Sequence, residues 1–487
     1  MPRLLDHLPP PSPEDHEYSR WLSGVALTLG AVCVGYAIHI RDGEYTPYAL
    51  WQITLAMLLC AAGVAFPRAP DPRRLGGHLL VAVLATSVGY QFLHLLRSPP
   101  GGWNWWSDDV KVVSATGFRF FYGGVGAASL LSIGLLGARR IRLLCLACLF
   151  AIHFALGAWM IRASPSPHID VFLFQQEAPR ALLHGQNPYR IEFADIYHGT
   201  AQERDREVYG HGLSEQGKLK FGFPYPPLSL YLATLGYALA GDHRYAQLAA
   251  MTLASFLVAF CRPGRISALA AVLLLFTPRA FFVLGRGWTE PFVVLMIAAT
   301  VFCACRRLRW ALPVALGLLL AVKQYMVFAA PLALLLVPRP WTPRRVAGLL
   351  GPAVAVAAVV TAPLALWDWH AFFHSAAVVQ KVAPFRDDAL SYLVWIDHQY
   401  GVKGGMAVPF VAMLVGLGLA LWRLPPHPSG FAAALAMTYL PFIAFNKQAF
   451  ANYYYFVIGA LCCAVAALPP PGDDFALPPK SEPPSVR

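Results

Sequence analysis

The chain has 487 residues, of which 57% are hydrophobic and only 13% are charged. So little charged surface excludes a string of soluble domains and indicates a protein that crosses a membrane many times. The formal net charge of +12 does not indicate a nucleic-acid partner, because the basic residues are spread over short loops instead of being gathered on one domain.

Fourteen apolar segments are long enough, or nearly long enough, to cross the hydrocarbon core as helices. They predict an all-α polytopic membrane protein, a bundle of about 12 to 14 transmembrane helices. The segments lie at 21–40, 47–66, 75–96, 117–138, 141–161, 244–261, 264–277, 287–304, 308–323, 325–338, 345–366, 404–422, 429–445 and 450–468.

The two ends of the chain, 1–20 and 469–487, are rich in proline and polar residues and are predicted to be disordered cytoplasmic tails. No cleavable signal peptide is evident, so the first helix is expected to direct its own insertion. Short arginine-rich loops recur between the spans, as the positive-inside rule predicts for cytoplasmic loops. These arginines are Arg68, Arg73, Arg74, Arg139, Arg140, Arg142, Arg262, Arg265, Arg306, Arg307, Arg309, Arg339, Arg344 and Arg345.

A loop of about eighty residues, 162–243, follows the fifth span and lies outside the cytoplasm by the same rule. Within it, 224–240 is as apolar as a span. Counting it as one would invert every later basic loop, so we expect this segment to lie on or dip into the outer interface without crossing. An ordinary spanning helix is the alternative.

An acidic residue lies near the start of the first helix predicted in this loop. Ser166 and Pro167 are typical of a helix start, and Asp170 and Glu177 share one face of the helix. A carboxylate in this place can act as a general base on a substrate hydroxyl, so Asp170 is our catalytic candidate. The alternative is a solvated carboxylate or a partner of the helix dipole.

Three further polar groups are expected to face the same compartment. Arg286 and Glu290 lie between the seventh and eighth spans, and Lys323 and Gln324 mark the junction of the ninth and tenth. The third group combines 367–401, which contains His398, with 445–455, which contains Lys447. Two lysines and an arginine around one cleft would bind an anion such as a phosphate. The alternatives are an Arg286–Glu290 ion pair and lysines that extend to the headgroups. The remaining candidate binding residues are Gln176, Glu177, Asn187, Tyr189, Tyr225, His398, Lys447, Asn452 and Tyr453.

The sequence favours a reaction without a metal or a nucleotide. The nine cysteines lie in or beside apolar segments, and Cys145 and Cys148 have no second pair at matching spacing, so we expect no disulfide framework and no zinc site. Carboxylates are not clustered in the long loop, and no phosphate-binding glycine loop is present. We therefore expect no cofactor and a lipid-borne donor.

Three features of the long loop occur in a characteristic order. Asp170 is followed by GQNPY at 185–189 and then by YPPL at 225–228. Gly185 predicts the end of the helix that begins near Asp170, and Asn187 with Pro188 predicts an extended or turned chain after it. This order resembles glycosyltransferase family 87 and, more broadly, the GT-C superfamily of polyprenyl-phosphate-sugar-dependent transferases, over roughly 141–460. Members of this family usually carry the loop after their first span, whereas here it follows the fifth.

The resemblance implies a fold, a reaction and roles for particular residues. It implies a catalytic region at 141–468 with juxtamembrane helices in the outer loop, Asp170 as the general base and a basic residue such as Lys323 at the donor phosphate. The implied reaction moves mannose or a related sugar from a polyprenyl phosphate to a lipid or glycan at the outer face of the cell membrane. Inversion at the sugar is expected.

Four additional spans, 21–140, would precede this catalytic region. Aromatic and acidic residues of their outer loop would add to acceptor binding: Trp103, Trp105, Trp106, Asp108 and Asp109. Two other classes of protein remain open. A transporter or flippase of lipid-linked glycans would show internal repeats and broken helices, and a ligase or polymerase of surface polysaccharide would use a diphosphate donor.

Overall fold

Helices make up most of the described chain. The computed structural model describes residues 18–66, 69–70, 75–99, 115–200 and 208–469. Its only strands are two short antiparallel pairs, β1 (Tyr18–Ser19) with β2 (Ala69–Pro70) and β3 (Ser214–Glu215) with β4 (Lys218–Leu219). The predicted all-α fold is therefore confirmed for these residues. Most of the predicted tails and the candidates Trp103, Trp105, Trp106, Asp108 and Asp109 lie outside them.

Most of the helices follow one another along the chain with short connections, whereas a long connection at 184–226 separates α6 from α8. Their bounds are α1 (Trp21–Ile40), α2 (Pro47–Ala65), α3 (Leu75–Arg97), α4 (Ala115–Ile133), η3 (Gly134–Leu136), α5 (Arg139–Ala163), α6 (Asp170–Leu183), α8 (Pro227–Ala240), α9 (Arg244–Cys261), α10 (Arg265–Leu275), α11 (Ala280–Arg286), α12 (Glu290–Cys305), α13 (Ala311–Val322), η4 (Gln324–Leu336), α14 (Pro343–Trp367), α15 (Trp369–Phe373), η5 (His374–Val378), α16 (Val379–Val382), α17 (Tyr392–Tyr400), α18 (Ala407–Arg423), α19 (Pro428–Ala444) and α20 (Ala451–Ala466). Of these, η3 and η4 are 3-10 helices and η5 is a π-helix.

The helices fall into two length classes. Seven are long and apolar enough to cross a membrane: α1, α2, α3, α4 with η3, α5, α9 and α14. α10 and α11 pass the same test together, with a bend of 46° between them. The other predicted spans are shorter apolar helices of 10–17 residues: α12, α13, η4, α18, α19 and α20. The chain is therefore a multi-pass membrane protein, and the predicted 12 to 14 spans are reached only if these shorter helices also cross.

The junction between α13 and η4 shows how a short helix can extend far. Lys323, between the two, has an extended backbone (φ −150°, ψ 146°). η4 then continues for 13 residues as a 3-10 helix. Because a 3-10 helix rises about 2 Å per residue, against about 1.5 Å in an α-helix, this segment extends over about 26 Å. That length is close to the thickness of the hydrocarbon core.

The segment predicted to lie at the outer interface forms α8. Pro226 precedes this helix and Gly241 ends it in the left-handed conformation (φ +75°). With 14 residues, α8 is about 21 Å long, which is less than the thickness of the hydrocarbon core. Its place at the interface stays a prediction.

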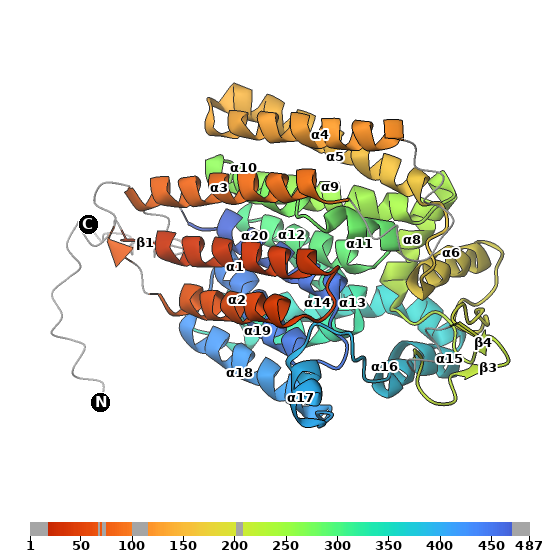
Figure 1. Cartoon of the computed structure of the whole chain (residues 1–487). Helices are drawn as coiled ribbons and strands as arrows, with labels where there is room; N and C mark the ends of the chain where they lie inside the picture. Colours follow the sequence, from red (N-terminus) through yellow and green to blue (C-terminus); the bar gives the residue numbers. More distant parts are fainter. Residues whose placement is uncertain (1–17, 67–68, 71–74, 100–114, 201–207, 470–487) are drawn as a thin grey trace.

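The helices of 21–140, called here the N-terminal block, are packed into the bundle. α1 contacts α2, α3 and α20, and α2 contacts α19. Figure 1 shows α6, β3, β4, α15 and α16 together at one end of the bundle, with β1 and the turn between α4 and α5 at the opposite end. The long loop is therefore gathered at a single end of the molecule.

The long loop has a small hydrophobic core of its own, separate from the main core of the bundle. Phe174 of α6 packs against Phe193 and Phe221, with ring centroids 4.8 Å and 5.9 Å away. Leu364 of α14 and Val379 of α16 complete this core. Buried aromatic rings of this kind supply most of the stabilisation in a small core, so they hold α6 and its first residue in a fixed place.

Candidate active site

A cavity of about 910 Å³ lies where the start of α6, the end of α11 and the junction of α13 and η4 meet. It is large enough for a sugar phosphate and part of a lipid chain. Its wall contains eight of the candidate residues: Asp170, Tyr225, Arg286, Lys323, Gln324, Lys447, Asn452 and Tyr453. Residues that lie far apart in the sequence therefore meet around one space.

The carboxylate of Asp170 is recessed in the cavity wall. Its Oδ1 accepts a hydrogen bond from the Val171 amide (2.7 Å), and its Oδ2 accepts one from the Tyr209 hydroxyl (3.3 Å). Desolvation raises the pKa of Asp170, while the Val171 amide, the positive charge of Arg386 and the Tyr209 hydroxyl act in the opposite direction. A carboxylate with a raised pKa is a stronger base than a solvated one, provided that it remains ionised.

The start of α6 differs from the prediction. Ser166 and Pro167 lie in the non-helical segment before α6, and Ile169 is the extended N-cap residue without a capping side chain. Asp170 is therefore the first residue of the helix, where free backbone N–H groups and the helix dipole favour a negative charge. The end of α6 was predicted correctly, because Gly185 adopts the left-handed conformation (φ +72°) just beyond it.

Lys323 is part of a buried ion pair. Its Nζ lies 2.9 Å from Glu290 Oε1, donates to the Thr289 hydroxyl and lies 4.3 Å from the centre of the Tyr225 ring. The Tyr325 hydroxyl donates to the same Glu290 oxygen (3.3 Å). The Glu290 side chain is fully buried, so part of the lysine charge is neutralised within the protein.

This pairing replaces the Arg286–Glu290 pair considered from the sequence. Arg286 instead ends α11 with its guanidinium 5.3 Å from the centre of the Phe282 ring. Among the described cations that line the cavity, Arg286 is the one without a hydrogen bond or ion pair to a protein acceptor. The other cations are bonded as follows: Arg41 to Glu44, Lys323 to Glu290, Arg386 to Asp388, and Lys447 to the carbonyls of Lys381 and Ala383. Arg286 therefore has donors available for an anion.

Three residues that were not among the predicted site residues also line the cavity, in two regions. One provides Arg386, which forms two bonds to Asp388 (3.0 and 2.8 Å) and acts electrostatically on Asp170. The other provides Tyr197 and Tyr209, which lie between the two family-like motifs. The adjacent charges of FRDD at 385–388 could have indicated Arg386. The spacing of Tyr197 and Tyr209 in the sequence gave no indication of a site.

The turn between α1 and α2 forms another part of the wall. Its lining residues are Arg41, Asp42 and Glu44. The turn depends on Gly43, whose φ is +84° and where a Cβ atom would lie 2.5 Å from the Ala451 nitrogen of α20. The Tyr45 amide donates to the Asp388 carbonyl (2.8 Å). The N-terminal block thus contributes directly to the cavity.

The other candidates lie away from the cavity lining. The Asn187 side chain accepts from the Tyr189 amide (3.0 Å), and the Tyr189 hydroxyl donates to the Tyr225 carbonyl (2.8 Å). GQNPY therefore shapes a turn and holds YPPL in place. The Gln176 amide donates to the Gly241 carbonyl (2.7 Å). Of the remaining candidates, Glu177 is exposed on α6, Glu290 is buried beneath the cavity wall, and His398 contacts Tyr45.

Metal ligands are not grouped in the part of the chain that the structure describes. No three or more His, Cys, Asp or Glu side chains there lie close enough to hold a metal ion. Gln324 donates to the carbonyls of Pro224 and Ala376, so its amide connects the YPPL segment to η5. The charged side chains that line the cavity are the carboxylates of Asp42, Glu44, Asp170 and Asp388 and the cations Arg41, Arg286, Lys323, Arg386 and Lys447.

Comparison with known proteins adds one structural similarity. No family model matches the chain, and no curated protein matches its sequence. The chain is similar to the crystal structure of ArnT from Cupriavidus metallidurans bound to undecaprenyl phosphate, with a TM-score of 0.43 and 15% sequence identity. The similarity covers 68% of this chain and 60% of that one, which is less than two thirds of the length of ArnT. A similarity at this level does not identify a reaction.

Proposed function

We propose that the chain is a membrane glycosyltransferase that moves a sugar from a polyprenyl-phosphate donor to a hydroxyl group of a lipid or glycan acceptor. The observation that carries the proposal is the presence, around one cavity, of the recessed Asp170 carboxylate and the Arg286 guanidinium without a protein acceptor. A base and an anion-binding group on one space are what transfer from a phosphate leaving group requires.

The apolar part of the wall supports a lipid-borne donor. Phe328 of η4, Phe410 of α18 and Phe442 of α19 follow one another along it, with ring centroids 5.7 Å and 5.5 Å apart. Apolar rings beside a few polar groups are typical of a site that binds an amphipathic ligand. The isoprenoid chain would lie against these rings, with its phosphate at Arg286.

The reaction would proceed as a single displacement. Asp170 accepts the proton of the acceptor hydroxyl as that oxygen forms a bond to the anomeric carbon. The bond between the anomeric carbon and the phosphate oxygen breaks, and the polyprenyl phosphate leaves with the electron pair. Arg286 stabilises the negative charge on the leaving group, while Lys323, which keeps its bond to Glu290, adds a partial positive field. Attack from the face opposite the phosphate inverts the configuration.

The distribution of arginine supports an extracytoplasmic cavity in the plasma membrane. The turn that precedes Arg139 and Arg140 lies at the opposite end of the bundle from α6 (Figure 1). The positive-inside rule would make that end cytoplasmic. The sugar would then be transferred outside the cytoplasm, where polyprenyl-phosphate sugars do not compete with nucleotide sugars.

The first test uses Asp170→Asn, which keeps the size of the side chain and removes the base. With a purified polyprenyl-phosphate mannose donor and a glycan acceptor, we expect transfer to fall by about 10²–10⁴-fold. Binding of polyprenyl phosphate should remain, because the cations are unchanged. Measured transfer by Asp170→Asn at the wild-type rate would contradict the proposal.

The same assay separates the competing classes. A ligase or polymerase would accept the matching diphosphate donor and leave the monophosphate donor unused. A transporter would move the labelled lipid between leaflets of a vesicle without forming a new glycosidic bond. Other monophosphate-linked sugars tested in parallel would identify the sugar.

A further inference from the structure

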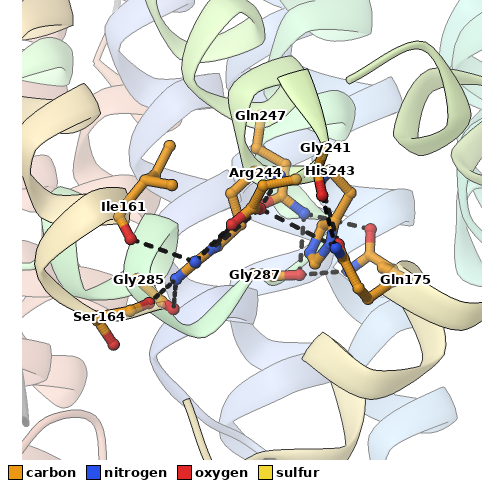
Figure 2. Close-up of polar contacts among 11 residues, drawn as sticks. Ile161, Ser164, Gln175, Gly241, His243, Arg244, Gln247, Gly285 and Gly287 are labelled. Atoms are coloured by element: carbon orange, nitrogen blue, oxygen red, sulfur yellow. Dashed lines mark hydrogen bonds and ion pairs between the residues drawn. The ribbon is translucent and has the colours of Figure 1, made fainter. Parts of the chain in front are cut away.

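A second polar cluster lies beside the cavity and contacts the backbone on both sides of Arg286 (Figure 2). Its side chains come from α6 and from the start of α9: Gln175, Gln176, His243, Arg244 and Gln247. Four of them, Gln175, His243, Arg244 and Gln247, have no exposed surface. Polar groups buried this deeply are costly unless hydrogen bonds compensate them.

Arg244 holds the residue before Arg286. Its Nη1 donates to the carbonyls of Gly285 (3.2 Å) and Ser164 (2.8 Å), and its Nη2 donates to the Ile161 carbonyl (3.3 Å). Asp242 accepts from the same guanidinium through both of its oxygens. Arg244 therefore joins the end of α5 to the last turn of α11, as Figure 2 shows.

Two glutamines hold the residue after Arg286. The side-chain amides of Gln175 and Gln247 both donate to the Gly287 carbonyl, Gln247 at 2.9 Å, and Gln247 also donates to Gln175 Oε1 (3.2 Å). Gly287 has a φ of +72°, and a Cβ atom there would lie 2.7 Å from His243 Nε2. The backbone at this point therefore fits only glycine and is fixed by α6 and α9 together.

The same cluster is tied to the helix that carries the base. Gln175 lies on α6, five residues after Asp170, and Phe172 of α6 lies 4.8 Å from the Arg244 guanidinium. Satisfying the last carbonyls of α11 alone would need only a capping residue or water. Here the bonds instead link the backbone of Arg286 to the helix of Asp170.

We propose that Gln175 and Gln247 are positioning residues that set Arg286 at a fixed distance from Asp170 across the cavity, so that the donor phosphate is held where the base can act. This inference rests on the proposed function. If Gln175 and Gln247 position Arg286, their loss weakens phosphate binding in particular. A purely structural role would not have this selective effect.

The test compares two probes in full-length protein reconstituted in nanodiscs. Gln247→Met removes the bonds to Gly287 and Gln175 at similar volume. We expect the Kd for polyprenyl phosphate to rise about tenfold, the effect of losing one positioned charge contact. The Kd for polyprenol, which lacks the phosphate, should stay within about twofold, because the apolar wall is unchanged. Thr252→Val, on the same helix but bonded to Leu248 and His153, is the matched control and should change neither value.

A double-mutant cycle with Arg286→Ala decides whether Gln247 acts through Arg286. If it does, Gln247→Met adds little once Arg286 is gone. Additive effects, an unchanged Kd for polyprenyl phosphate or an equal loss of polyprenol binding would overturn the inference. If Gln247→Met does not fold, Gln175→Met removes the other donor to Gly287 and is read in the same way. If wild-type protein and Arg286→Ala bind both probes alike, the proposed function itself fails.

Discussion

The charge state of Asp170 is set by opposing neighbours. Desolvation raises the pKa of its carboxyl, and the Tyr209 hydroxyl is one of the groups that lower it. The Tyr197 hydroxyl instead accepts a hydrogen bond from the Asp170 backbone amide (3.4 Å). Tyr209 therefore bonds the Asp170 carboxylate and Tyr197 bonds the Asp170 backbone, so the two tyrosines are a matched pair for measuring the pKa of Asp170.

Replacing Tyr209 should change the pH dependence of transfer. Tyr209→Phe removes a bond that favours the charged carboxylate, so the pKa of Asp170 should rise by up to about one unit. The base acts only when it is ionised, and the acidic limb of kcat/KM should therefore move to higher pH by the same amount. Tyr197→Phe should not produce this shift. A limb that moves to lower pH in Tyr209→Phe would contradict this account of the base.

At the scale of elements, the connection between α1 and α2 is the least expected part of the cavity wall. Gly43 lets the turn pass directly over the start of α20, and Asp42, in the left-handed region (φ +56°), lies 2.6 Å from Arg279 Nε. A non-glycine residue in this conformation costs about 1–3 kcal/mol and usually occurs where the surroundings impose it.

A substitution at Gly43 should separate this turn from the rest of the wall. Gly43→Ala would place a Cβ atom against the Ala451 backbone in a conformation that alanine avoids, and should destabilise the protein by about 2 kcal/mol or more. Gly77→Ala is the matched control, because nothing lies within 4 Å of a Cβ at that position of α3. Thermal unfolding in detergent measures both. Equal melting temperatures for the two variants would show that the turn is not held as described.

Several elements were predictable from local signals, and their side-chain directions were not. The glycine and proline of GQNPY indicated a turn, which the structure contains. The side chains of Asn187 and Tyr189 form hydrogen bonds with the backbone of that turn and of YPPL. Such bonds are common for residues in turns. Lys323 was selected because a charge at the end of an apolar helix is unusual, but its partner Glu290 lies on another helix, and such pairing depends on packing that the sequence does not reveal.

At the scale of the molecule, apolar segments and basic loops predicted a polytopic helical bundle and a single long loop. They did not reveal that α1 and α2 pack on α19 and α20. Membrane helices are apolar on every side, so the periodicity that marks a buried face in a soluble helix carries little information here. For the same reason, the length of the shorter helices could not be judged from composition alone.

The orientation of the molecule can be tested with two new cysteines. Gln216, in the turn between β3 and β4, and Arg140, at the start of α5, are both exposed. In intact cells a membrane-impermeant maleimide should label Gln216→Cys, whereas Arg140→Cys should react only after permeabilisation. The native cysteines are buried or half-buried, and the parent chain measures their background. Labelling of Arg140→Cys alone in intact cells would place the cavity in the cytoplasm.

The packing of the turn between α1 and α2 against the start of α20 has a consequence for biosynthesis. About 400 residues separate α1 from α20, and a ribosome adding roughly 5–20 residues per second needs roughly 20–80 s to produce them. During that interval the turn between α1 and α2, with Arg41, Asp42 and Glu44, lacks its contact with α20. The cavity wall is complete only after α20 has been synthesised and inserted, so under the proposed function a nascent chain would be inactive until that point.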